Sequence, residues 1–289
     1  MSKETVFRSP LDKSPSISRR LLLGAAAAGA FSAAGCGNVQ SAVPAKPKLD
    51  LSLYELTFAE EFDDPNFDME AFNKRWYAHT PWHGDFGDAQ FTDPRPGFPF
   101  MVDNGNLTIV AEKGQDGKWR SGLISSLNHE GVGFAQQYGY FECRCRMPPG
   151  PGVWPAFWLD SWYPGMTDPS IEIDVFEYYG KFPTDIHSTV TVWPKNDLVK
   201  KTSEGHIHKV EGTTLTDEFH VYGVSVDPDW VAFYFDGQET WRTPTPATHK
   251  HPLVVLCNLA LGSGWPIDET INPSFFTVDY IRVYKLKNT

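Results

Sequence analysis

Alternating apolar and polar positions predict short β-strands along most of the chain. From Leu51 onward, β-branched and aromatic runs are separated by Gly, Pro, Asn and Asp, and no helical periodicity is sustained. The predicted strands are 107–111, 139–147, 171–178, 186–192, 219–226, 231–235, 253–261 and 276–284. Asp236-Gly237 predicts a tight turn after one of them. The pattern predicts an all-β, two-sheet antiparallel sandwich formed by residues 51–289.

The first 50 residues follow a different pattern. The pair Arg19-Arg20 precedes an apolar segment too short for a stable transmembrane helix, as in a twin-arginine export signal; a short buried helix is the alternative. Residues 33–36, Ala-Ala-Gly-Cys, resemble a lipoprotein cleavage site, with ordinary cleavage as the alternative. We expect an export signal at 1–36 and a linker at 37–50. The protein would then be periplasmic, lipid-anchored to the cell envelope through Cys36, or secreted.

Composition and charge limit the partners. With 41% hydrophobic and 14% aromatic residues, the chain can form one large core. The first 36 residues carry five basic and two acidic side chains, a net charge of +3. Since the net charge of the whole chain is −11, the remaining residues carry −11 − 3 = −14. Such an acidic domain disfavours nucleic acid as a partner, whereas a neutral polysaccharide is indifferent to charge. We expect a monomer that contacts a membrane only through an N-terminal lipid.

Three carboxylates occur within one predicted strand, at residues 171–177. Strand alternation puts Glu172 and Asp174 on one face. Glu177 is out of phase, but one extra residue bulged near 175–176 would return it to that face. The outer two carboxyls would then lie about 5 Å apart, the separation used in retaining glycoside hydrolysis. By spacing alone, a solvated acidic face or a cation site explains the three acids equally well.

The surroundings of this run favour the catalytic interpretation. Glu-x-Asp-x-x-Glu, preceded by 153–158 and followed by 178–180, resembles the signature of glycoside hydrolase family 16 in its bulged-strand, laminarinase-like variant. Six further segments match that family in order: 60–63, 104–107, 138–142, 233–237, 258–261 and 278–284. The resemblance implies a concanavalin-like β-jelly roll. It also implies Glu172 as nucleophile, Asp174 as its hydrogen-bonding helper and Glu177 as general acid/base, with no cofactor required for catalysis.

Aromatic residues near these motifs indicate how sugar would be bound. Sugar rings stack on indoles, and the chain has ten Trp. Core packing is the alternative for each Trp, and we expect at least one of Trp154 and Trp158 to be in the core. The resemblance adds a cleft histidine and asparagine. The predicted substrate-binding residues are Trp154, Trp158, Trp162, His187, Asn258 and Trp265.

The resemblance also implies a structural calcium. Its ligands would be Glu61, the backbone oxygen of Gly105, and Asp279, three oxygen donors that suit a hard cation. The alternative is that these acids merely face solvent.

The predicted function is that of a retaining endo-β-glycosidase acting on a β-1,3- or mixed β-1,3/1,4-glucan or a related exopolysaccharide. A transglycosylase using the same carboxylates and a galactan-specific hydrolase are the alternatives. A non-catalytic lectin should have lost one of the acids, and all three are present. Thr167, where the family often has Trp-Pro, and the segment 84–91 depart from the family pattern, so the polysaccharide stays open.

Overall fold

The computed structural model describes residues 47–64, 69–195 and 199–287. The chain divides into two units, Met1–Pro44 and Ala45–Thr289. The first unit, with the predicted export signal and Cys36, lies outside the described residues. Within the described ranges, no helix is long and apolar enough to cross a membrane. The strands and the candidate site belong to the second unit.

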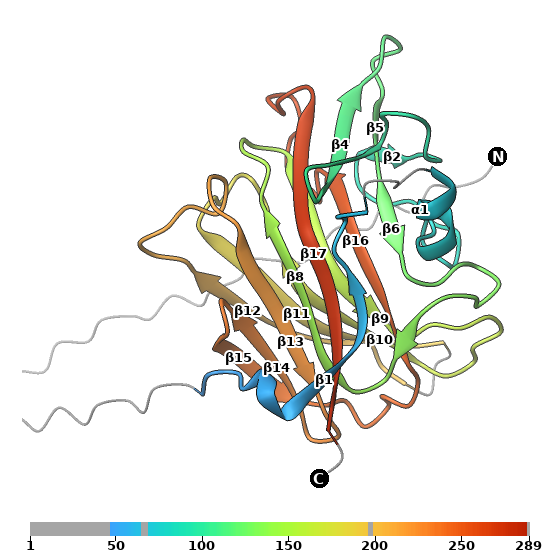
Figure 1. The fold of residues 1–289 in the computed structure, drawn as a ribbon, viewed down its shortest axis with the longest axis vertical. Coiled ribbons are helices and arrows are strands. Elements are labelled where there is room, and N and C mark those ends of the chain that lie inside the picture. Colours follow the sequence, from blue (N-terminus) through green and yellow to red (C-terminus); the bar gives the residue numbers. More distant parts are fainter. Residues whose placement is uncertain (1–46, 65–68, 196–198, 288–289) are drawn as a thin grey trace, which may run out of the picture. The chain divides into compact units, whose positions relative to one another are not determined.

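Strands in the described part of the chain form two sheets, one of ten and one of seven strands (Figure 1). The order of the first is β15–β14–β13–β8–β17–β4–β5–β2, with β1 beside β17 and β3 beside β4. Its strands are β1 (Tyr54–Glu60), β2 (Ala89–Phe91), β3 (Phe100–Asp103), β4 (Asn106–Lys113), β5 (Trp119–Ser121), β8 (Gly139–Arg146), β13 (His220–Val226), β14 (Trp230–Phe235), β15 (Gln238–Pro244) and β17 (Ser274–Leu286). All pairs are antiparallel except the short parallel pair β2–β5.

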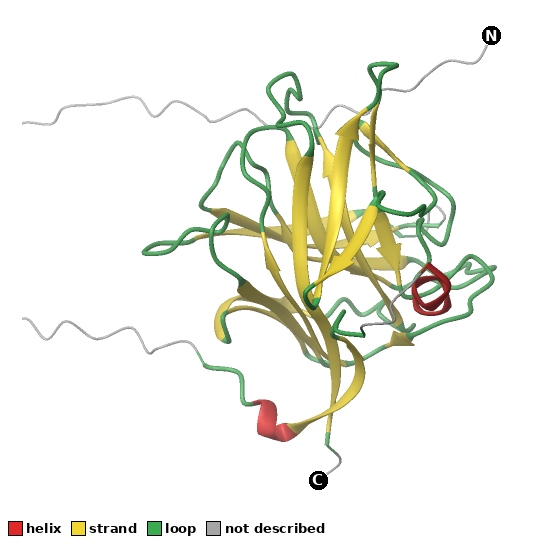
Figure 2. Ribbon diagram, turned by 45° about the horizontal axis from the view of Figure 1, so that its top comes forward, coloured by secondary structure: helices red, strands yellow, loops and turns green. Residues whose placement is uncertain are grey.

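The second sheet carries the predicted catalytic strand near its centre. Its order is β12–β11–β10–β9–β16–β6, with β7 beside β16. Its strands are β6 (Leu123–Ser125), β7 (Ala135–Gln136), β9 (Val153–Asp160), β10 (Ser170–Glu177), β11 (Asp185–Trp193), β12 (Thr202–Lys209) and β16 (Leu253–Leu261). Helices are few in the described chain, namely the 3₁₀ turn η1 (Leu51–Leu53) and α1 (Met69–Arg75). Strands dominate the fold (Figure 2), which confirms the all-β sandwich.

Alternation along each strand builds the core between the sheets. Phe141 and Cys143 of β8, Leu159 of β9 and Ile173 of β10 all lie in one buried apolar cluster. Since successive side chains point to opposite faces, the residues between them on β9 and β10 lie on the outer face of the seven-stranded sheet. Strand β12 has no predicted counterpart because its residues are almost all exposed, so the sequence shows no apolar alternation there.

A loop covers part of this outer face. Trp82 and Phe86 pack against a second buried cluster that includes Trp158 and Ala260. Gly87 brings the loop close to β16: a Cβ there would lie 2.6 Å from the Leu261 oxygen, and its φ is +74°. Only glycine fits this close approach without strain. The segment 84–91, which departs from the family pattern, therefore forms a wall beside the candidate site.

Candidate active site

A β-bulge in β10 puts the three acids on one face. Against β9, Asp174 pairs with Trp158 and Phe176 with Phe157, so Val175 is the extra residue. Against β11 the register shifts over the same stretch. Both Val175 and Phe176 are buried, and Glu177 returns to the outer face with Glu172 and Asp174, where all three are half-buried. The predicted bulge is therefore confirmed.

Two aromatic donors hold the carboxyl of Glu177. The Trp154 indole N–H donates to its Oε1 over 2.9 Å, and the Tyr179 hydroxyl donates to the same oxygen over 2.8 Å. The Trp154 and Tyr179 rings are stacked, with centroids 6.1 Å apart. His187, predicted to lie near Glu177, is its Cα partner on β11 and packs against the Tyr179 ring. Burial lowers the pKa of His187, so the ring is neutral near pH 7.

Different groups surround Glu172. Its Cα partners are Thr191 on β11 and Asp160 on β9. The Trp193 side chain hydrogen-bonds Glu172. Lys201 Nζ lies 3.6 Å from the centroid of the Trp193 ring and also acts on Glu172 through its charge. Glu172 thus meets one indole donor and one cation.

The row of acids is electrostatically crowded. Burial raises the pKa of Asp174 well above its usual range, and the charges of Glu172, Glu177 and Asp160 add to the effect. Burial also raises the pKa of Glu177, although the Tyr179 and Trp154 donors oppose the rise. The pKa of Glu172 rises to about 7, chiefly through burial. Burial therefore favours the protonated form of all three acids.

The pKa of Glu172 is raised along with that of Glu177, because burial acts on the whole row and the charge of Lys201 only partly offsets it.

The structure separates the predicted substrate-binding residues into two groups. Trp158 is only 5% exposed and donates to the Asn258 side chain over 2.8 Å, and Asn258 is fully buried. These two side chains hydrogen-bond each other within a buried cluster, which confirms that one of Trp154 and Trp158 belongs to the core; their contact with sugar stays a prediction. The half-buried residues that can reach a ligand are Trp154, Trp162, His187 and Trp265.

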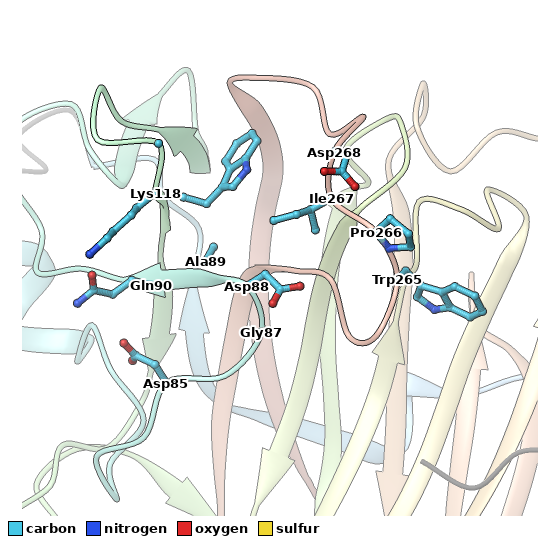
Figure 3. A pocket seen from close by; sticks show the side chains of 12 residues that line it. Asp85, Gly87, Asp88, Ala89, Gln90, Lys118, Trp265, Pro266, Ile267 and Asp268 are labelled. Atoms are coloured by element: carbon cyan, nitrogen blue, oxygen red, sulfur yellow. The ribbon is translucent and has the colours of Figure 1, made fainter. Parts of the chain in front are cut away.

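A pocket of about 710 Å³ is lined by residues of three segments, none of which includes the acids of β10. One wall is the segment 85–90, which approaches the end of β16, and the facing wall is 265–268 (Figure 3). Trp265 on that second wall packs edge-on against Phe182, and Lys181 Nζ lies 3.9 Å from the centroid of the Trp265 ring.

The predicted calcium ligands are brought together but are already paired. Strands β1 and β4 meet β17 on either side of Asp279, which puts the segments of Glu61 and Gly105 beside it. Both Glu61 oxygens accept from Arg282 over 2.7 Å, and Asp279 pairs with Arg144. Among the described residues, no group of three or more His, Cys, Asp or Glu could hold a metal ion. As arranged, the two carboxylates do not fit a cation, and the calcium stays a prediction.

Three residues of the site were not singled out from the sequence. Tyr179 lies two residues after Glu177, Trp193 lies six after His187, and Asp160 lies two after Trp158. Each shares a face with its predicted neighbour through the period of two along its chain segment. The alternation along the chain therefore pointed to these residues, but using it required the positions at which the strands end, which periodicity alone does not specify.

Comparisons with known proteins agree with this geometry. Residues 97–282 match the family described as glycosyl hydrolases family 16. The chain is 35% identical over 265 residues to the endo-1,3-1,4-β-glycanase ExsH of Rhizobium meliloti (strain 1021), covering 82% of this chain and 53% of that protein. It is 35% identical over 267 residues to the glucan endo-1,3-β-glucosidase A1 of Niallia circulans, covering 80% and 38%. The chain thus spans about half the length, or less, of these relatives.

Solved structures lead to the same family. The catalytic fold resembles that of SCLam, a non-specific endo-β-1,3(4)-glucanase from family GH16, with a TM-score of 0.67 and 26% identity. The alignment covers 84% of this chain and 96% of that one.

Proposed function

Because the chain belongs to glycosyl hydrolases family 16 and is a retaining glycoside hydrolase, we propose that it cleaves internal bonds of a β-1,3- or mixed β-1,3/1,4-linked glucan. The observation that carries the proposal is the bulge at Val175, which returns Glu177 to the face of Glu172 and Asp174. The relatives named for endo-1,3- and endo-1,3-1,4-activity support the linkage.

Glu172 is the proposed nucleophile. Its carboxylate oxygen bonds to the anomeric carbon while the glycosidic C–O bond breaks, and Glu177 gives its proton to the departing oxygen. Water then loses a proton to Glu177, its oxygen bonds to the anomeric carbon, and the bond to Glu172 breaks. The roles are those that the family resemblance implies. Trp154 and Tyr179 fix the carboxyl of Glu177, and burial raises its pKa above the usual range.

Asp174 is the proposed positioning acid between them. Burial raises the pKa of Asp174, and in its protonated form it can donate to the Glu172 carboxylate and favour that charge next to the developing positive charge of the sugar. The raised pKa of Glu172 predicts that activity falls as the pH drops below about 7, because the nucleophile must be ionised.

Cleavage of laminarin, lichenan, agarose, carrageenan and bacterial exopolysaccharides, followed by reducing-end release, tests the substrate class. We expect activity on the first two. Proton NMR of the first product should show the β-anomer, and no product longer than the starting oligosaccharide should form. Activity only on a galactan would contradict the linkage, an α-anomer would contradict the roles of the acids, and longer products would indicate transglycosylation.

Export of the folded protein is also proposed, on the Arg19-Arg20 pair and the residues before Cys36. The detergent partitioning of the full chain and of Cys36→Ser tests the anchor. A lipid on Cys36 should move only the unsubstituted protein into the detergent phase; if both stay in water, the anchor is absent.

A further inference from the structure

A fourth carboxyl group lies beside Glu172. Asp160, the last residue of β9, is the Cα partner of Glu172 across the antiparallel β9–β10 pair. Phe157 and Leu159 of the same strand point into the core, so the period of two directs Asp160 to the outer face, with Trp158.

The pairing of Asp160 with Glu172 is the closer of the two kinds in an antiparallel sheet. The neighbouring pair, Ser161 and Ile171, makes a main-chain hydrogen bond of 2.9 Å from Ser161 N to Ile171 O. Hydrogen-bonded and non-hydrogen-bonded pairs alternate, so Asp160 and Glu172 form a non-hydrogen-bonded pair, in which Cα atoms lie about 4.5 Å apart and the side chains come closer together. A ligand bound over Glu172 would therefore lie close to the position of Asp160.

Asp160 lacks the partners that a buried acid needs. It is 5% exposed, and its Oδ1 is buried without a hydrogen bond within the described residues. Three kinds of group face Asp160: the acids Glu172 and Asp174 on β10, Val254 on β16, and Lys195 after the end of β11. The positive charge of Lys195 only partly offsets the burial of Asp160 and the negative charge of Glu172. Burial raises its pKa well above the usual range, which favours the protonated form. A buried polar group left unpaired is costly, and Asp160 lies on the same outer face as Glu172.

We propose that Asp160 is a specificity-determining residue that hydrogen-bonds a hydroxyl group of the sugar unit bound over Glu172. The proposal rests on the glucanase function above and deepens it. A neutral carboxyl group both donates and accepts, as a sugar hydroxyl does, so one contact satisfies both groups. A site built to pair with a hydroxyl rejects an analogue that lacks it, because its own polar group is then left unpaired.

The test couples a change in the enzyme to a change in the substrate. Aryl β-laminaribioside and analogues deoxygenated singly at the 2-, 4- or 6-position of the unit bound over Glu172 are assayed for kcat/KM with the unsubstituted enzyme, Asp160→Ala and Asp160→Asn. For one position, we expect deoxygenation to lower kcat/KM about tenfold in the unsubstituted enzyme and to have almost no effect in Asp160→Ala. Asp160→Asn, which can still donate and accept, should retain part of the discrimination.

Thr191→Val is the matched control. Thr191 flanks Glu172 on the opposite strand and is equally buried, but its hydroxyl is satisfied by Ser203 at 3.0 Å. This variant should show the same deoxygenation losses as the unsubstituted enzyme, and circular dichroism checks that each variant is folded. If each deoxygenated analogue lowers kcat/KM by the same factor in the unsubstituted enzyme and in Asp160→Ala, the proposed contact between Asp160 and the sugar is wrong, while the glucanase function stands. If the unsubstituted enzyme cleaves neither the aryl laminaribioside nor laminarin nor lichenan, the proposed function falls, and this inference with it.

Discussion

Replacing Glu172 with glutamine should stabilise the fold above neutral pH while abolishing turnover. The carboxyl lies in a buried row of acids, and its charged form is disfavoured by burial and by Glu177. Glutamine has nearly the same shape and carries no charge, so it removes the cost of ionising a group in that environment. Glu172 would then lower the stability of the folded chain while it serves the reaction, as residues of active sites often do.

The size and sign of the effect follow from the pKa. In the folded chain it rises from 4.5 to about 7. The folded state therefore binds the Glu172 proton more tightly than the unfolded state does, so stability is fully present below about pH 4 and decreases as the pH rises through 7. A shift of this size corresponds to about 3 kcal/mol at high pH. Because Asp174 and Glu177 titrate together with Glu172, we expect Glu172→Gln to gain about 1–3 kcal/mol at pH 8.5 and almost nothing at pH 4.

Urea unfolding at pH 4 and pH 8.5 measures this difference. In a domain of this size each kcal/mol also raises Tm by about 2–4 °C. Glu269→Gln, at an exposed position, is the control and should change stability little at either pH. A loss of stability in Glu172→Gln at pH 8.5, or an equal gain at both pH values, would refute the electrostatic reasoning.

The remaining predictions concern the other acid and the calcium. Glu177→Ala should still cleave an aryl glycoside with a good leaving group, and azide should rescue it to a β-glycosyl azide; no azide product, or an α-azide, would contradict the acid/base role. Tyr179→Phe removes a donor to the Glu177 carboxylate, so the pKa of Glu177 should rise and the alkaline limb of kcat/KM should move to higher pH; an unmoved limb would contradict this. If calcium binds near Glu61 and Asp279, a chelator should lower Tm in calorimetry, whereas an unchanged Tm would leave the two arginine pairs as the stabilising contacts.

The sequence by itself determined the main strands and the row of three acids on β10. Alternation is a local property, so it identified the strand 253–261 with the bounds of β16 and the two faces of β10. The out-of-phase position of Glu177 required a bulge, because three acids can share a face of that strand only if one residue is skipped. These conclusions depend on the order of residues along one strand.

Only the tertiary structure decided what each side chain meets. Trp154 and Trp158 belong to one face of β9, yet the loop carrying Trp82 and Phe86 covers Trp158 and leaves Trp154 half-buried. The close pairing of Asp160 with Glu172 likewise depends on the register between two strands, which the sequence of either strand does not specify. Burial and charge at a position are sums over neighbours from distant segments, and therefore the pKa of Glu172 could be obtained only once those segments were placed.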